Sequence, residues 1–389
     1  MAKHGRAAPA APDDASGLTA EWLTTALRHG GLIEAASVTA AVVEPIGTDQ
    51  AFAGQPWRVR LSYDRPTDKG GADAGAPATL VAKLPAVDPA MRRALSGLRW
   101  YEAEIRFYDE VAPLADILTP RRYYTAMQPD ERNYVLLLED VTAGTVGDQI
   151  AGATLAQAQT IVDHIARLHA QWWDSPMLDA FDWLARGAVR RAEAAEFWAG
   201  FYQQGWPVAR DLMSARPDPP LPDGIDTIAE RLASAYAALV RESAESPRTL
   251  LHGDCRLDNV FFPDAGPSPA AAAPVTFIDW QLVSAGRGAY DLAYFLGTNL
   301  TPDVRRAHEE ALLERYHAVI VERDPGYGLD RLRSDYGLGL LLVFGFWVQT
   351  AGAATYPEAG YPLRDAALGR VSRALLDRDA GALLHRLDT

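Results

Sequence analysis

The residues whose types and spacing could support catalysis lie between Thr249 and Gln281. This stretch begins with TLLHGDCRLDNVFF and ends with PVTFIDWQ. Asp254 is followed five residues later by Asn259, and Asp279 ends a second apolar run. A loop with a carboxylate and a carboxamide at this spacing can present one oxygen to a substrate proton and another to a metal. Mg²⁺ binds a few protein oxygens together with water and phosphate oxygens, and phosphoryl transfer needs such a site beside a base.

Asp254 and Asn259 also have a simpler interpretation, because Asp and Asn are common turn formers. The joint occurrence of HGD, the asparagine and the IDW that contains Asp279 favours a functional site. HGDxxxxN followed by IDWQ resembles the signature of the aminoglycoside phosphotransferase-like superfamily, which includes choline kinases and ecdysteroid kinase-like proteins. Members often carry histidine two residues after the motif's aspartate, where this chain has Arg256.

The resemblance implies a small-molecule kinase with an α+β, two-lobed, protein-kinase-like fold. A small β-rich N-terminal lobe would precede a large, mainly helical C-terminal lobe. Asp254 would be the catalytic residue that accepts or orients the proton of the attacking hydroxyl. Asn259 and Asp279 would hold Mg²⁺ against the phosphates of ATP or GTP.

A lysine and a glutamate are expected to complete the phosphate site. A lone lysine at a strand end is usually a solvated charge, but Lys83 ends a VAK run, as the phosphate-binding lysine does in kinase-like folds. Its partner should be a glutamate on the following helix. Glu104 shares a helical face with Tyr101 and Tyr108, whereas Glu102 does not, so the spacing favours Glu104.

The remaining nucleotide contacts are implied only by chain order. The turn that contains Gly47 and Thr48 resembles a nucleotide-covering loop, although it lacks the GxGxxG spacing of protein kinases. The strand end with Leu138, Glu139 and Val141 would contact adenine through its backbone groups.

Other residues of the motif region are expected to be structural. His252 is expected to pack and to form hydrogen bonds, and Asp291 is expected to brace the loop from the start of a helix. Cys255 is interpreted as a small buried residue and not as a nucleophile, because no catalytic His/Cys pattern accompanies it.

Hydrophobic patterning predicts strands early in the chain and helices later. The expected strands are residues 37–45, 57–63, 79–84 and 133–138, and the expected helices include 89–111, 155–173, 192–212 and 225–243. Thr19 is a plausible N-cap for an earlier helix. Residues 1–17 are rich in Ala, Pro and Asp and are expected to form a disordered tail. We therefore expect a nucleotide-binding lobe over residues 18–138 and a catalytic and substrate lobe over residues 139–389.

Composition argues against several classes of partner. A net charge of −14 disfavours nucleic acid and anionic membranes, which need basic surfaces. Cys255 is the only cysteine, so an intrachain disulfide is impossible and a reducing compartment is indicated. The most apolar run, Gly337 to Val348, is shorter than the roughly 20 residues of a membrane span and is interpreted as a buried helix. The first residues lack the apolar segment of a secretory signal, and we expect a cytoplasmic location.

The function expected from these features is transfer of the γ-phosphoryl group of ATP to a hydroxyl of a small molecule. Aminoglycosides, amino sugars, choline-like alcohols and other natural products all remain open as acceptors, and the sequence does not indicate an oligomeric state. The alternative is a pseudokinase, which would bind nucleotide in a regulatory role. The joint presence of Lys83, Asp254, Asn259 and Asp279 favours the enzyme.

Overall fold

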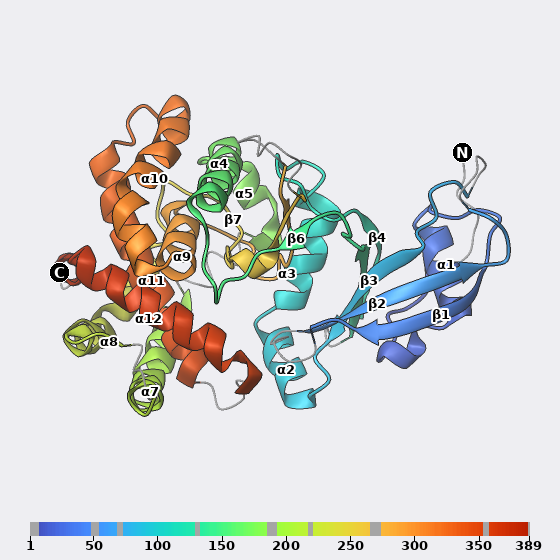
Figure 1. The fold of residues 1–389 in the computed structure, drawn as a ribbon, viewed down its shortest axis with the longest axis horizontal. Coiled ribbons are helices and arrows are strands. Elements are labelled where there is room, and N and C mark those ends of the chain that lie inside the picture. The colour runs from blue at the N-terminus through green and yellow to red at the C-terminus, as the bar shows by residue number, and fades with distance from the viewer. Residues whose placement is uncertain are drawn as a thin grey trace. The chain divides into compact units, whose positions relative to one another are not determined.

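The computed structural model describes residues 8–47, 54–67, 73–128, 133–184, 193–216, 221–264, 274–352 and 358–387. The chain divides into two compact units (Figure 1). Unit 1 comprises Met1–Leu114 and Thr119–Thr142, and unit 2 comprises Ala115–Leu118 and Ala143–Thr389. Unit 1 contains a small antiparallel sheet and unit 2 is mainly helical, which confirms the predicted α+β class. Relative to the boundary expected at residue 138, the short segment Ala115–Leu118 belongs to unit 2, and unit 1 extends to Thr142.

The sheet of unit 1 has the strand order β1-β2-β3-β5-β4, and all neighbouring strands are antiparallel. Its strands are β1 (Val38–Pro45), β2 (Gly54–Tyr63), β3 (Thr79–Pro85), β4 (Arg122–Met127) and β5 (Tyr134–Glu139). Four of these match the expected strands, whereas β4 is not among them. Because β3 lies between β2 and β5, the backbone that carries Lys83 is held on both sides.

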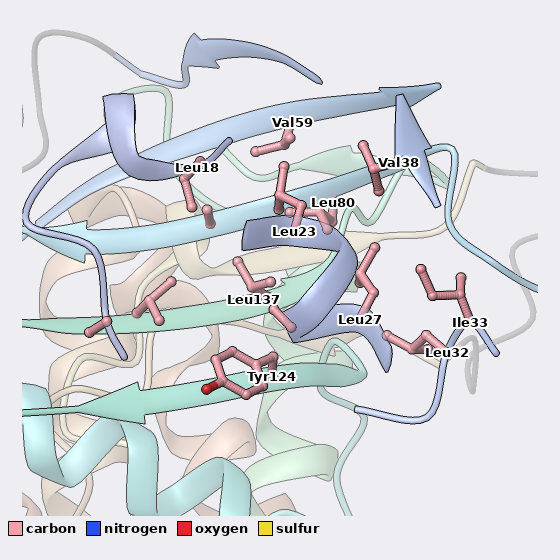
Figure 2. Close-up of a cluster of buried hydrophobic side chains, with 14 of the residues drawn as sticks. Leu18, Leu23, Leu27, Leu32, Ile33, Val38, Val59, Leu80, Tyr124 and Leu137 are labelled. Atoms are coloured by element: carbon pink, nitrogen blue, oxygen red, sulfur yellow. The ribbon is translucent and has the colours of Figure 1, made fainter. Parts of the chain in front are cut away.

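Helix α1 (Ala20–His29) contributes to the apolar core of unit 1. The side chain of Thr19 caps it by accepting the backbone N–H of Trp22 at 3.2 Å, as predicted. Leu23 and Leu27 are fully buried among residues of the sheet such as Leu80 (Figure 2). The packing of this helix therefore helps to fix the position of β3.

Residues 8–17 have a defined path, so the prediction of a disordered tail is wrong for them. The indole N–H of Trp22 donates to the carbonyl of Ala10 at 2.9 Å, and the Asn133 amide donates to Asp13 at 2.6 Å. A 3₁₀ turn, η1 (Ala15–Gly17), leads into α1. The segment is ordered by contacts with distant residues, which its composition does not reveal.

The helix expected over residues 89–111 is interrupted. It consists of α2 (Pro89–Gly97), α3 (Trp100–Arg106) and a π-helical turn, η2 (Phe107–Val111). The break occurs because Arg99 adopts a left-handed backbone conformation with φ of 59°. Such a conformation is uncommon for residues other than glycine.

Within its described residues, unit 2 contains helices and two small sheets. Its helices are α4 (Leu155–Trp172), α5 (Met177–Ala180), α7 (Ala195–Ser214), α8 (Ile225–Glu242), α9 (Ala289–Asn299), α10 (Pro302–Arg323), α11 (Leu329–Gly352) and α12 (Tyr361–Asp377), with 3₁₀ turns η3 (Leu257–Asn259), η4 (Glu358–Gly360) and η5 (Ala380–Arg386). One sheet pairs β7 (Thr249–Leu251) with β10 (Ser284–Gly286), and the other has the order β6 (Thr145–Val146), β8 (Val260–Phe262) and β9 (Thr276–Phe277).

Helices α9 and α11 pack closely in unit 2 (Figure 1). Every residue of α9 is buried. A Cβ placed on Gly339 of α11 would lie 3.0 Å from the carbonyl oxygen of Ala289, so glycine allows the close approach. The apolar run of α11 is buried, as predicted, and no described helix is long and apolar enough to cross a membrane.

Candidate active site

The backbone of the motif loop is held by one carboxylate. The N–H groups of His252 and Gly253 donate to Asp291 at 2.7 and 2.9 Å. Gly253 has φ of +83°, and a Cβ at this position would lie 2.2 Å from the carbonyl oxygen of Leu282. Only glycine satisfies both constraints without strain, so the tight turn after β7 depends on Gly253 and on its acceptor.

Asp291 lies in the first turn of α9 and is fully buried. Burial alone would raise the pKa of its carboxyl, but hydrogen bonds from His169 and the backbone of Gly253, with the nearby charges, hold that pKa below its usual value. His169 contacts Asp291 through Nε2 at 3.3 Å and the hydroxyl of Tyr316 through Nδ1 at 2.8 Å. Asp291 thus braces the loop, as predicted, by accepting hydrogen bonds from its backbone.

The carboxylate of Asp254 has three donors around it. The hydroxyl of Tyr294 donates to Oδ1 at 2.6 Å. Oδ2 accepts from Arg256 Nε at 3.1 Å and from Asn259 Nδ2 at 3.0 Å. Burial and the charge of Asp254 raise the pKa of Tyr294 well above its usual value, so this hydroxyl remains a donor. The orientation of the Asp254 carboxylate is therefore determined from three directions.

Strand pairing brings Asn259 and Asp279 to the same end of a hairpin. In the register of β8 and β9, Val260 pairs with Phe277, and the N–H of Ile278 donates to the carbonyl of Asn259 at 2.9 Å. Asp279 is partly exposed and has φ of 65°. A left-handed backbone at a residue other than glycine costs free energy and is frequent at functional sites. The hairpin therefore juxtaposes the two residues that the sequence predicts as metal ligands.

The donor set of this hairpin fits Mg²⁺. Asn259 uses its Nδ2 for Asp254, while its Oδ1 has no hydrogen-bond partner in the part of the chain that the structure describes. Among the described residues, no cluster of three or more His, Cys, Asp or Glu side chains is arranged to hold a metal. Mg²⁺ does not require one, because it retains waters and uses substrate phosphates as ligands.

Two predictions of structural roles in this loop hold. The Nε2 of His252 contacts the carbonyl oxygen of Ile278 at 3.0 Å, and its Nδ1 accepts the N–H of Asp254 at 3.3 Å. His252 thereby connects the loop to the residue before Asp279. Cys255 is fully buried, and burial raises the pKa of its thiol well above the usual value, which disfavours a nucleophilic thiolate.

Within unit 1, Lys83 and Glu104 form an ion pair. Their Nζ and Oε1 atoms are 2.6 Å apart, and Glu104 is almost completely buried. Glu102 contacts Arg99 and Arg106 instead. Glu104, which the helical spacing favours over Glu102, therefore does pair with Lys83 in the structure, although the helix is interrupted at Arg99.

The residues predicted to contact adenine differ in whether their backbone groups already form hydrogen bonds. Leu138 lies in β5 between β3 and β4, and the backbone N–H of Glu139 donates to the carbonyl of Arg121 at 2.8 Å. The amide of Glu139 is thus not free for a base. Val141 is partly exposed, and its backbone groups form no hydrogen bond within the described residues. Gly47 follows β1 with φ of +61°, and Thr48 lies outside the described residues.

Comparison with known proteins identifies the family. The model of the ecdysteroid kinase-like family matches residues 49–324, which is more than half of the chain. The chain belongs to the ecdysteroid kinase-like family. This membership and the α+β architecture confirm the fold class and the superfamily that the motifs imply. No protein of curated function matches this ecdysteroid kinase-like chain.

Several solved structures are similar to this family member. Ethanolamine kinase from Plasmodium vivax is 11% identical, with a TM-score of 0.48 and coverage of 87% of this chain and 83% of that chain. Choline kinase from Cryptosporidium parvum Iowa II is 8% identical, with a TM-score of 0.48 and coverage of 90% and 94%. The GDP complex of an aminoglycoside 2′-phosphotransferase is 14% identical, with a TM-score of 0.45 and coverage of 85% and 93%.

Sequence reasoning misses two residues of this ecdysteroid kinase-like site. Tyr294 contacts Asp254, and His169 contacts Asp291. Tyr294 could have been found, because it lies three residues after Asp291 and such residues share a helical face. His169 comes from a distant helix, α4, and no local pattern identifies it.

We expect Asp291→Asn to destabilise unit 2. The amide can no longer accept both backbone N–H groups and the contact from His169, and a buried unsatisfied group costs about 1–3 kcal/mol. Because folding lowers the pKa of Asp291, its ionised form stabilises the protein above the usual carboxyl pKa, and this contribution is lost as the pH falls. Urea unfolding should therefore show a deficit in the free energy of unfolding near neutral pH, and this deficit should narrow as the pH falls below about 4.

The matched control is Asp330→Asn, whose carboxylate is 96% exposed and should contribute little. Equal stability of Asp291→Asn and wild type at neutral pH, or a deficit that does not narrow in acid, would contradict the bracing role.

Proposed function

We propose that this protein is an ATP-dependent phosphotransferase that acts on a hydroxyl of a small molecule. The observation that carries this proposal is the β8–β9 register, which sets Asn259 beside Ile278 and Asp279. Asp254 contacts Asn259 directly, so a candidate base and two oxygen ligands lie together. Phosphoryl transfer needs this combination, since its catalysis is mainly positioning and charge stabilisation.

In the proposed reaction, Asp254 orients the acceptor hydroxyl and accepts its proton. The acceptor oxygen forms a bond to the γ-phosphorus, and the bond from this phosphorus to the bridging oxygen breaks, so that ADP leaves with the electron pair. Asn259 and Asp279 would hold Mg²⁺, which supplies positive charge to the phosphates. Lys83, positioned by Glu104, would contact the phosphates, and Val141 would contact adenine through its backbone. GTP is the alternative nucleotide.

The acceptor is proposed only as a class: an aminoglycoside, an amino sugar, a choline-like alcohol or another hydroxylated natural product. The net charge of −14 is compatible with a cationic acceptor. The test of the function itself does not need the acceptor, because kinases hydrolyse ATP slowly when water takes its place.

The purified protein should hydrolyse ATP in the presence of Mg²⁺ and not in the presence of EDTA. The alternative function, a pseudokinase, requires nucleotide binding without turnover. Mg²⁺-dependent binding with no hydrolysis or transfer would favour the pseudokinase, and no nucleotide binding would contradict both.

Asp254→Asn should reduce turnover by orders of magnitude while nucleotide affinity changes little. The substitution keeps the shape of the side chain and removes the charge that attracts the proton. General-base contributions are typically ~10² to 10⁴-fold, so a loss below about tenfold would contradict this role. The control Asp303→Asn removes an exposed carboxylate outside the motif loop and should retain activity. A comparable loss of ATP affinity in Asp254→Asn would indicate a metal ligand instead.

Asp279→Ala should abolish Mg²⁺-dependent turnover and leave the fold intact, because Asp279 is partly exposed. The dependence of activity on Mg²⁺ concentration, with circular dichroism as a check of the fold, provides the measurement. Asp264→Ala, which alters an exposed carboxylate just after β8, is the matched control. Near-normal activity of the Asp279 variant would show that the metal assignment is wrong.

Lys83→Ala should lower turnover strongly, since charge and positioning supply most of the catalysis in phosphoryl transfer. Glu104→Gln should have the same effect in weaker form, because the lysine loses its partner. Glu102→Gln is the control, since this carboxylate forms ion pairs with Arg99 and Arg106. Steady-state kinetics with ATP provide the measurement. A larger loss of turnover in Glu102→Gln than in Glu104→Gln would contradict the assignment of Glu104 as the partner of Lys83.

A further inference from the structure

Arg256 lies two residues after the proposed base, within the same loop. Its Nε donates to Asp254 Oδ2 at 3.1 Å, and its Nη1 donates to Asp258 Oδ2 at 3.4 Å. Its backbone is fixed as well: its N–H donates to Asp254 and its carbonyl accepts from Asn259. The side chain is only 19% exposed. The guanidinium is therefore held in a defined position beside the Asp254 carboxylate.

The guanidinium of Arg256 stays protonated. Burial opposes the charged form, but the negative charge of Asp254 and further interactions with Tyr294, Asp258 and Asp279 raise the pKa of Arg256. A permanent positive charge thus lies beside the proposed base.

The guanidinium also has N–H donors that these contacts do not use. Arginine carries five N–H donors in a planar fork. The contacts above use Nε and Nη1, and Nη2 has no partner among the residues that the structure describes. A planar fork with an unused edge is well suited to phosphate oxygens, which arginine binds through charge-assisted hydrogen bonds.

We propose that Arg256 is a further catalytic residue, whose Nη2 edge donates to oxygens of the γ-phosphoryl group during transfer while Nε holds Asp254. This inference rests on the proposed function. One rigid plane would then align the base with the phosphorus that its hydroxyl attacks, and the positive charge would stabilise the charge that builds up on the phosphoryl oxygens. The bonds that form and break are those of the proposed reaction, because Arg256 stays protonated and exchanges no proton.

The competing role for Arg256 is purely structural, as a link between Asp254 and Asp258. The two roles differ in their dependence on the γ-phosphate. A structural link would affect ADP and ATP equally, whereas a contact to the transferred group affects only nucleotides that contain it.

The test is calorimetric binding of Mg·ADP and of the non-hydrolysable analogue Mg·AMP-PNP to wild type, Arg256→Gln and Arg256→Lys. We expect Arg256→Gln to weaken AMP-PNP binding by roughly tenfold or more relative to ADP binding. Arg256→Lys keeps the charge but cannot form both contacts at once, so it should show a smaller loss of the same kind. The control Asp258→Asn breaks the second ion pair of Arg256 and should keep the wild-type ratio of the two affinities.

Equal weakening of both nucleotides in Arg256→Gln, or no weakening of either, would overturn the inference and leave the proposed function standing. If Arg256→Gln does not fold, an unchanged AMP-PNP to ADP ratio in Arg256→Lys would overturn it in the same way. Failure of the wild type to bind either Mg·nucleotide would instead overturn the proposed function, and the inference with it.

Discussion

The buried carboxylate of Asp291 is the interaction on which the site depends. A buried charge is costly unless it is hydrogen-bonded, and Asp291 meets this requirement with the backbone of His252 and Gly253 and with His169. The same contacts fix the turn that precedes Asp254. Because α9 is fully buried and packs closely on α11, the loop acquires its geometry from the helical core of unit 2.

A single helix determines both the backbone and the side chain of the proposed base. Asp291 holds the turn, and Tyr294, one helical turn later, donates to the Asp254 carboxylate. The proposed metal ligands are positioned differently, by the register of β8 and β9 and by the strained backbone of Asp279. His252 connects the two arrangements through its contacts to Asp254 and Ile278. A change in either arrangement would therefore displace the other.

Much of the fold could be predicted because local periodicity determines it. Strand alternation identified four strands of the sheet in unit 1, and helical phase selected Glu104 as the partner of Lys83. The left-handed residue Arg99 could not be predicted, because arginine has no special preference for that conformation. The hydrogen bond from the Glu139 N–H to the carbonyl of Arg121 could not be predicted for a related reason, since Arg121 directly precedes β4, a strand not anticipated from the pattern.

The candidate site shows the same limit. Motif spacing identifies Asp254, Asn259 and Asp279, but the donors around Asp254 depend on which helix faces the loop. Arg256 appears in the sequence only as a departure from a family pattern, and its contacts with Asp254 and Asp258 are visible only in the folded loop. Charges that converge from separate elements are a tertiary property that spacing alone does not encode.

We have proposed that this protein transfers a phosphoryl group to a small-molecule hydroxyl. The most direct measurement incubates the wild type with Mg²⁺, γ-¹⁸O-labelled ATP and a panel of hydroxylated metabolites, and follows the label by mass spectrometry. We expect the ¹⁸O label in the phosphate monoester of at least one acceptor and none in ADP. Binding of Mg·ATP with no labelled phosphate in any product, inorganic phosphate included, would contradict it.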